Sequence, residues 1–172
     1  GLVDGVTLAN LLTTEPRPRN RVLADAMKRI GVVERSGRGV DTIYRGMLKF
    51  GRPAPDYSPT NLSGVVVRLP TGAADLDFRR LVVEEERRRT NELPIDSLIA
   101  LAAVREFKRV TADELATRIQ RDAGSAKRTL EALTEAGMVE AHGSTRGRSY
   151  TLSAAVYQRQ DDKAGYTRQA GF

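Results

Sequence analysis

The stretch Arg109–Leu152, RVTADELATRIQRDAGSAKRTLEALTEAGMVEAHGSTRGRSYTL, contains the pattern of a helix-turn-helix followed by a hairpin. Thr111 is a suitable N-cap, and Glu114 completes a capping box. Asp122 can cap a second helix, and Gly137 supplies its left-handed stop. The apolar residues of the two helices recur at helical spacing: Leu115, Ala116 and Ile119, then Ala126, Leu130 and Leu133. Two short helices with a tight connection predict a helix-turn-helix.

The flanking residues supply the remaining parts of a winged helix. Residues 138–142 and 150–152 predict two short strands joined by the turn 143–149. Residues 94–107 predict a preceding third helix, whose apolar set is Ile95, Leu98, Ile99, Leu101, Ala102 and Phe107. The phrase LEALTEAGMVE, residues 130–140, resembles the winged-helix transcription-regulator pattern, in which the recognition helix ends at a glycine before the wing. We therefore expect a winged helix-turn-helix domain over residues 94–160.

The composition excludes several classes of protein. The chain has 172 residues, enough for one large or two small domains, and no apolar run long enough to span a membrane. It has no cysteine, which rules out disulfides and thiolate metal sites and fits a cytoplasmic location. The single histidine, His142, cannot form a multi-histidine metal site, and we interpret it as a surface residue. Nucleophilic catalysis through a Ser-His-Asp or Cys-His pair has almost no candidates here.

The net charge of +6 suggests a nucleic-acid partner, but its distribution qualifies that interpretation. Residues 1–70 hold 11 Lys and Arg against 6 Asp and Glu, whereas residues 111–152 hold 6 against 6. The excess of positive charge therefore lies in the front of the chain. A winged helix that is neutral as a whole can still bind DNA if its basic residues gather on one face.

The front of the chain predicts a second, mixed domain over residues 1–70. Residues 6–12 predict a short helix, and residues 62–69, which include three consecutive valines, predict a strand. Asn20 should cap an amphipathic helix over 21–30, and a second helix should run from 41 to 50. Their expected apolar positions are Val22, Leu23, Ala26, Met27 and Ile30, then Ile43, Met47, Leu48 and Phe50.

Residues 71–93 predict a charged linker helix, and residues 161–172 a flexible tail. The sequence EEERRR within 75–90 allows Glu84–Arg88 and Glu85–Arg89 pairs one turn apart. We favour a solvated, self-paired helical face over the alternative, a DNA-binding arginine cluster. The tail can add one short helix, residues 154–157, to the winged helix.

Two segments of the front domain carry a family resemblance. They are RNRVLADAMKRIGVVERSGRGVDTIYRGMLKFGRPAPDY, residues 19–57, and VVVRLP, residues 65–70. They resemble the C-terminal region of bacterial RecG-like ATP-dependent helicases or transcriptional regulators. In that family a Schlafen-type domain comes first, a domain resembling the GHKL ATPase fold follows, and a winged helix often ends the chain. The resemblance implies an α+β protein that begins within a GHKL-like domain, as a piece of something longer.

A glycine pair in this region is a candidate phosphate-binding loop. Gly37 and Gly39 precede a helix and are flanked by Arg35 and Arg38, so backbone N–H groups could approach a phosphate. The resemblance implies the position of the second glycine box of GHKL ATPases. The alternative is a tight loop that needs a positive φ.

The resemblance also implies that the elements of an ATP site are incomplete. It places the metal-holding Asn helix and the first Asp-Gly box before Gly1, and the sequence has no G-x-x-x-x-G-K-[ST] loop. We therefore expect no catalytic residues, no enzyme activity and no cofactor in this chain. ATP and Mg²⁺ would be bound only by a full-length protein.

The candidate DNA-binding residues follow from the helical period. If the apolar stripe of the second helix faces the core, Ser125, Lys127 and Arg128 point outward near its start, the end that enters a major groove. Arg118 and Arg121 flank that entry, and Arg146 and Arg148 occupy the wing. These residues suit contacts with phosphates and base edges.

Three functions remain open from the sequence. The first is a transcriptional regulator that binds duplex DNA as a homodimer through the recognition helix and the wing. The second is the non-catalytic C-terminal part of an ATP-dependent, helicase-like protein. The third is a dimerisation or protein-interaction module, which an exposed apolar face on the front domain would favour. We expect no membrane partner.

Overall fold

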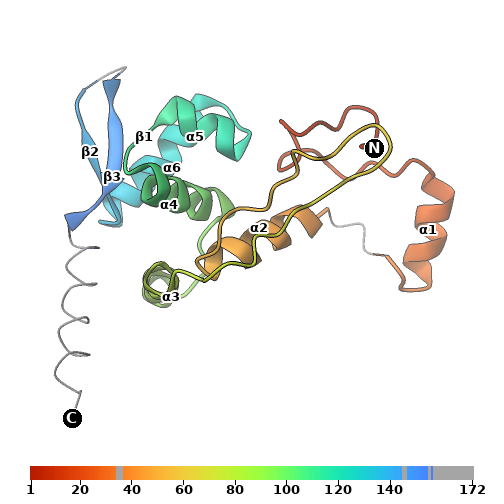
Figure 1. Cartoon of the computed structure of the whole chain (residues 1–172), viewed down its shortest axis with the longest axis horizontal. Coiled ribbons are helices and arrows are strands. Elements are labelled where there is room, and N and C mark those ends of the chain that lie inside the picture. The colour runs from red at the N-terminus through yellow and green to blue at the C-terminus, as the bar shows by residue number, and fades with distance from the viewer. Residues whose placement is uncertain (34–36, 145–146, 155, 157–172) are drawn as a thin grey trace, which may run out of the picture.

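The computed structural model describes residues 1–33, 37–144, 147–154 and 156, and its elements combine six helices with a small sheet within those ranges (Figure 1). The helices are α1 (Arg21–Arg29), α2 (Gly39–Lys49), α3 (Leu76–Arg89), α4 (Ile95–Phe107), α5 (Ala112–Ile119) and α6 (Ala123–Glu135). The strands are β1 (Val110–Thr111), β2 (Val139–His142) and β3 (Ser149–Leu152). The expected α+β class is thereby confirmed.

The three strands form an antiparallel sheet in the order β1-β3-β2. Val139 pairs with Leu152 in the hairpin, and Val110 pairs with Tyr150 on the other side of β3. The chain order α4-β1-α5-α6-β2-β3 is that of a winged helix, with β2 and β3 forming the wing. The sequence predicted both strands of the hairpin but missed β1, because a two-residue strand has no period to detect.

The expected caps hold the helix-turn-helix in place. Thr111 and Glu114 form the reciprocal capping box at the start of α5. Asp122 caps α6 by accepting from the amide of Ser125 at 2.9 Å. Gly137 has a φ of +69° just after α6, which is the left-handed conformation that the stop requires.

The core lies between α4 and the elements around it. Leu98, Leu101, Leu115, Leu130 and Tyr150 are at most 1% exposed and belong to one continuous cluster. Each fully buried leucine contributes about 1.5–3 kcal/mol relative to an exposed one. The same cluster continues through Phe78 and Val82 of α3 to Leu48 of α2. The front of the chain is therefore packed directly onto the winged helix through α2 and α3.

Two phenylalanines of the predicted helix faces, Phe50 and Phe107, lie at the surface instead of in the core. Phe50 is 48% exposed, and the guanidinium of Arg79 lies 4.9 Å from its ring centroid. Phe107 is 47% exposed beneath Arg118, whose guanidinium is 4.1 Å from the ring centroid. Each ring therefore has a cation over its face.

Residues 6–12 form successive turns, so the short helix predicted there is wrong. The side chain of Asn10 accepts from the amide of Thr7 at 2.7 Å and donates to the carbonyl of Gly5 at 3.0 Å. Asparagine side chains that bond to nearby backbone groups compete with the hydrogen bonds of a helix.

The strand predicted over residues 62–69 is also wrong. Residues 64–67 belong to no helix or strand, and the β-bridge in this part of the described chain joins the next residue, Arg68, to Asp56. Val65, Val66 and Val67 are 54%, 39% and 38% exposed. Without a neighbouring strand among the described residues, these valines do not become a sheet.

The amphipathic helix α1 forms where predicted, with Asn20 as its cap, but its expected burial is wrong. The side chain of Asn20 accepts from the amide of Leu23 at 2.9 Å. Val22, Leu23 and Ile30 are nevertheless 80%, 57% and 71% exposed. Figure 1 shows α1 at the end of the molecule remote from the wing. Its apolar face is covered by no part of the chain that the structure describes.

The linker helix α3 pairs its own charges and exposes Arg87 and Arg88, as predicted, but one of its carboxylates is buried rather than solvated. Glu85 is 4% exposed, and it accepts from Arg88 at 2.7 Å and from Arg89 at 2.6 Å. The predicted Glu85–Arg89 pair is therefore present, although its carboxylate is buried. Of the helix predicted over 154–157, the structure describes Ala154 and Val156, and Val156 is 2% exposed. The tail 161–172 lies outside the described residues.

Candidate nucleic-acid interface

The first turn of α6 presents an ordered set of polar groups. Asp122 accepts from both the amide and the hydroxyl of Ser125, at 2.9 and 2.6 Å. Arg128 donates from Nη2 to the same hydroxyl at 2.8 Å. These hydrogen bonds from Ser125 lower the pKa of Asp122. The cap thus fixes Ser125 and Arg128 on the outer surface of α6, as predicted.

A groove of about 670 Å³ separates the start of α6 from the wing. We call it the wing groove; it is lined by Thr111, Ala112, Asp113, Ala123, Gly124, Lys127, Arg148 and Tyr150. The structure therefore brings Lys127 of α6 and Arg148, the residue just before β3, to one site. The guanidinium of Arg148 lies 5.5 Å from the ring centroid of Tyr150, and Lys127 is 3.7 Å from Glu131. Arg148 and Lys127 make these contacts and still line the groove.

A second groove, of about 350 Å³, lies on another side of α6. We call it the flank groove; it is lined by Arg89, Pro94, Asp96, Ser97, Arg121, Ser125, Arg128, Thr129 and Ala132. Ser125, Arg128, Thr129 and Ala132 share a stripe of α6, because they are spaced by three and four residues. The predicted residues Arg121, Ser125 and Arg128 meet here. Lys127 and Arg128 point about 100° apart, so one helix lines both grooves.

Arg121 in the flank groove is held by a carboxylate of α4. Its Nε lies 2.9 Å from Oδ2 of Asp96. Burial raises the pKa of Asp96, although the neighbouring Arg121 acts in the opposite direction. The pair fixes the side chain of Arg121 at the start of the helix-turn-helix connection but neutralises part of its charge.

The structure separates the remaining predicted residues from these grooves. Arg118 stacks on Phe107 and lines a hollow between α2 and α4 together with Tyr44 and Leu48. It does not line either groove of α6. Arg146 lies outside the described residues. Arg89 lines the flank groove. The sequence could not predict this position, because no local sequence pattern shows that the end of α3 lies near α6.

The glycine loop has a local structural explanation. Gly37 has a φ of +70°, and a Cβ at this position would lie 2.5 Å from Cγ of Pro16. These two facts fit the alternative interpretation, a tight loop that needs glycine at position 37. At Gly39, the first residue of α2, a Cβ would meet no atom of the described residues within 4 Å. Arg38 is exposed, and Arg35 lies outside the described residues. Phosphate binding by this loop stays a prediction.

His142 and the acidic residues do not form a metal site in the described part of the chain. The Nε2 atom of His142 lies 2.8 Å from the hydroxyl of Thr151, and its side chain is exposed at the end of β2. The described helices include none long and apolar enough to cross a membrane.

Comparisons with known proteins find a family match for the front of the chain and a solved structure that is similar over most of the chain. Residues 1–69 match a family described as "Putative ATP-dependent DNA helicase recG C-terminal", which confirms the resemblance seen in residues 19–70. No curated protein sequence matches the chain significantly. The solved structure of the DIP2311 protein from Corynebacterium diphtheriae is similar over 94% of this chain, with a TM-score of 0.69 and 24% identity. That match covers 32% of the DIP2311 chain, so this sequence spans about a third of its length.

Two further solved structures show more distant likenesses. A MarR family transcriptional regulator from Silicibacter pomeroyi is matched over 52% of this chain and 60% of its own, with 19% identity and a TM-score of 0.37. TrmBL2, an archaeal chromatin protein with a novel mode of DNA binding, is matched over 53% of this chain and 38% of its own, with 18% identity and a TM-score of 0.35.

Proposed function

We propose that this chain binds duplex DNA through α6 and the wing, and that it acts as a DNA-binding transcriptional regulator. The N-terminal half of α6 would enter the major groove, with Ser125 and Arg128 facing base edges and Lys127 and Arg148 facing phosphates. Serine can bond to several base edges, and arginine pairs with guanine O6 and N7. Phosphate contacts fix the register of a protein on the duplex.

The observation that carries this proposal is the wing groove. Its lining includes Lys127 of α6 and Arg148, the residue just before β3, so two cations from separate segments border one concave surface. The side chain of Lys127 is 60% exposed, so it can reach a ligand without rearrangement of the fold. A phosphate backbone that passes between recognition helix and wing would contact both cations. The winged helix needs no net charge for this, because Lys127 and Arg148 line the same groove.

The acidic residues near this surface limit its affinity but do not block it. Asp113 also lines the wing groove, and Glu131 lies one turn beyond Lys127. Asp122 is engaged by Ser125 at the cap. We therefore expect binding that weakens as the salt concentration rises, with a slope set by the few cations that contact phosphates.

A fluorescence-anisotropy titration with random duplex DNA at two salt concentrations tests the proposal. The Lys127→Gln, Arg148→Gln double variant should bind more weakly and lower the slope of log K against log salt by about two, close to 0.9 per lost phosphate contact. The matched control is Lys28→Gln with Arg29→Gln, which removes two exposed cations from the end of α1. Equal slopes for both double variants would overturn the proposed interface. Addition of ATP and Mg²⁺ should leave binding unchanged.

A protein-interaction role is a second candidate, and the apolar face of α1 favours it. Val22, Leu23 and Ile30 are large, apolar and mostly exposed along one helix. Contiguous exposed apolar surface marks interaction sites in water-exposed proteins. This role is compatible with DNA binding, because α1 lies away from the wing and α6 (Figure 1). A homodimer through α1 would present two winged helices to one duplex.

A further inference from the structure

We infer that the C-terminal end of α3 is part of the DNA interface, with Arg89 contacting a backbone phosphate beside the recognition helix. This inference rests on the proposed function and extends it to a helix outside the winged helix itself. The partner is the phosphate backbone on the side of α6 that faces away from the wing.

The first support is the position of Arg89. Its side chain lines the flank groove together with Arg121 and Arg128, although it comes from a different helix than either. Three arginines from α3, the helix-turn-helix connection and α6 therefore border one shallow surface. Asp96 lies among them and is engaged by Arg121 at 2.9 Å. Arg89 and Arg128 are thus the cations of this groove whose charge Asp96 does not offset.

The second support is the way in which Arg89 is held. Glu85 is buried and accepts from Nε of Arg89 at 2.6 Å, and from Nε and Nη2 of Arg88 at 2.9 and 2.7 Å. Two guanidinium groups share one carboxylate, so the cluster keeps a net positive charge. The terminal amino groups of Arg89 make no hydrogen bond to another described residue. They remain available to a phosphate, while the Nε contact fixes the plane of the guanidinium.

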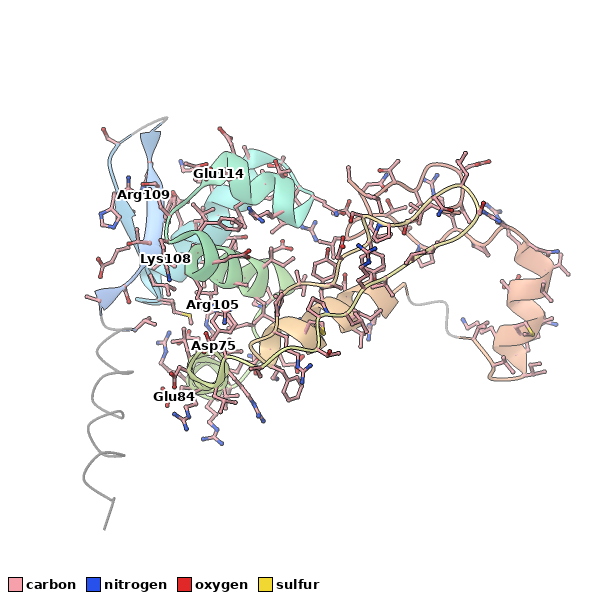
Figure 2. The ribbon with its side chains drawn as sticks, in the orientation of Figure 1. Asp75, Glu84, Arg105, Lys108, Arg109 and Glu114 are labelled. Carbon is pink, nitrogen blue, oxygen red and sulfur yellow. The ribbon has the colours of Figure 1, made fainter. Side chains whose placement is uncertain are left out.

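The third support is the rigid attachment of α3 to the winged helix. Phe78, Leu81 and Val82 of α3 are at most 6% exposed in the shared core. The cap residue Asp75 binds Arg105 of α4 at 2.9 Å, and Figure 2 shows this pair between the two helices. Arg89 is therefore held in a fixed position relative to α6. A side chain on a flexible linker would lose more entropy on binding.

The geometry of a duplex explains why two basic grooves border one helix. A helix in the major groove, which is about 12 Å wide, lies between the phosphate backbones of both strands. Lys127 and Arg148 would meet one backbone at the wing groove. Arg89, with Arg121, would meet the other at the flank groove, beside Arg128, which faces the base edges. This arrangement assigns a function to the arginine run of α3 that a purely solvated helix face would lack.

Anisotropy titrations of single variants test the inference. Arg89→Gln should weaken binding roughly tenfold at low salt, as expected for loss of one charge-assisted hydrogen bond, and lower the salt slope by about 0.9. Arg89→Lys keeps the charge and should retain the slope. The matched control is Arg80→Gln: Arg80 is paired with Asp77, is 61% exposed, and lies about half a turn around α3 from Arg89. It should leave both affinity and slope unchanged.

The outcomes separate this inference from the proposed function. If the unaltered chain does not bind duplex DNA, the proposed function fails. If it binds, and Lys127→Gln with Arg148→Gln reduces the slope while Arg89→Gln behaves like Arg80→Gln, the inference about α3 alone is overturned. Thermal unfolding of each variant by circular dichroism checks that the fold is retained.

A tethered cleavage reagent provides a second test that leaves Arg89 intact. The chain has no cysteine, so Asn91→Cys creates a single attachment site two residues beyond Arg89. An iron chelate at this position should cleave a bound duplex of defined sequence next to the protein-covered segment, whereas the same reagent at Arg80→Cys should not. Equal cleavage from both positions, or none from Asn91→Cys while the complex is intact, would contradict the inference.

Discussion

The side chain of Gln120 joins two parts of the chain that are more than 100 residues apart in sequence. Its Oε1 accepts from the amide of Leu12 at 2.7 Å, and its Nε2 donates to the carbonyl of Leu8 at 2.8 Å. Gln120 has a φ of +57° and ends α5 at the helix-turn-helix connection. The turns of the front segment are therefore fastened to the connection that orients the recognition helix.

Gln120→Asn should loosen this attachment. Asparagine tolerates a positive φ but is one methylene too short to reach both backbone groups. Each lost hydrogen bond is worth about 0.5–1.5 kcal/mol. Hydrogen exchange should show faster exchange of the Leu12 amide. The amide of Glu114, held by Thr111 at the other end of α5, is the internal control and should not change. Unaltered protection of Leu12 would show that the contact contributes nothing to stability.

Glu85→Gln should lower stability at neutral pH and reduce its dependence on acid. Burial acts to raise the pKa of Glu85, but hydrogen bonds and charge from Arg88 and Arg89 lower it overall. A carboxyl whose folded pKa is depressed stabilises the fold above its unfolded value, roughly 4.3, and loses this contribution as pH falls through the folded value. Urea unfolding between about pH 3 and 7 measures the difference. A variant whose stability falls in acid as steeply as the unaltered chain would contradict this account.

Asp96→Asn should strengthen binding to duplex DNA at low salt. The substitution removes a negative charge from the flank groove and releases Arg121, whose Nε lies 2.9 Å from the carboxylate. We expect a salt slope about one unit steeper, since one more cation becomes available to phosphates. Asp113→Asn in the wing groove is the companion variant: it should raise affinity without involving Arg121. Weaker binding by Asp96→Asn would indicate that the ion pair orients Arg121 for contact.

Val22→Lys combined with Ile30→Lys should reduce self-association of the chain. Both side chains are mostly exposed, at 80% and 71%, so we expect a change in stability within about 0.5 kcal/mol. Sedimentation velocity over a range of concentrations measures the association. The exposed pair Lys28→Gln and Arg29→Gln on the same helix is the control. A concentration-dependent dimer that persists in the lysine variant would exclude α1 as the contact.

The helix-turn-helix could be predicted from sequence because its determinants are local. Thr111, Glu114, Asp122 and Gly137 act within one turn of their own helix ends, and the structure places each in its predicted role. The outward direction of Ser125, Lys127 and Arg128 follows from the helical period alone.

Most of the wrong predictions concern contacts between segments that are distant in sequence. The valines of 65–67 have strand propensity, yet a strand needs a partner that sequence alone does not supply. The apolar stripe of α1 predicts burial without saying what would cover it. Arg118 stacks on Phe107 instead of lining a groove of α6. Arg89 lines the flank groove only because α3 shares the core of the winged helix.

A titration of the isotope-labelled chain with a duplex of about 15 base pairs, followed by amide NMR spectra, tests the central claim most directly. The account predicts shifts concentrated at the start of α6, from Ser125 to Thr129, at Arg148 just before β3, and at Arg89. The amide signals of α1 should not shift. Shifts confined to α1 and the front turns, with α6 and β3 unaffected, would contradict the assignment of this surface to DNA.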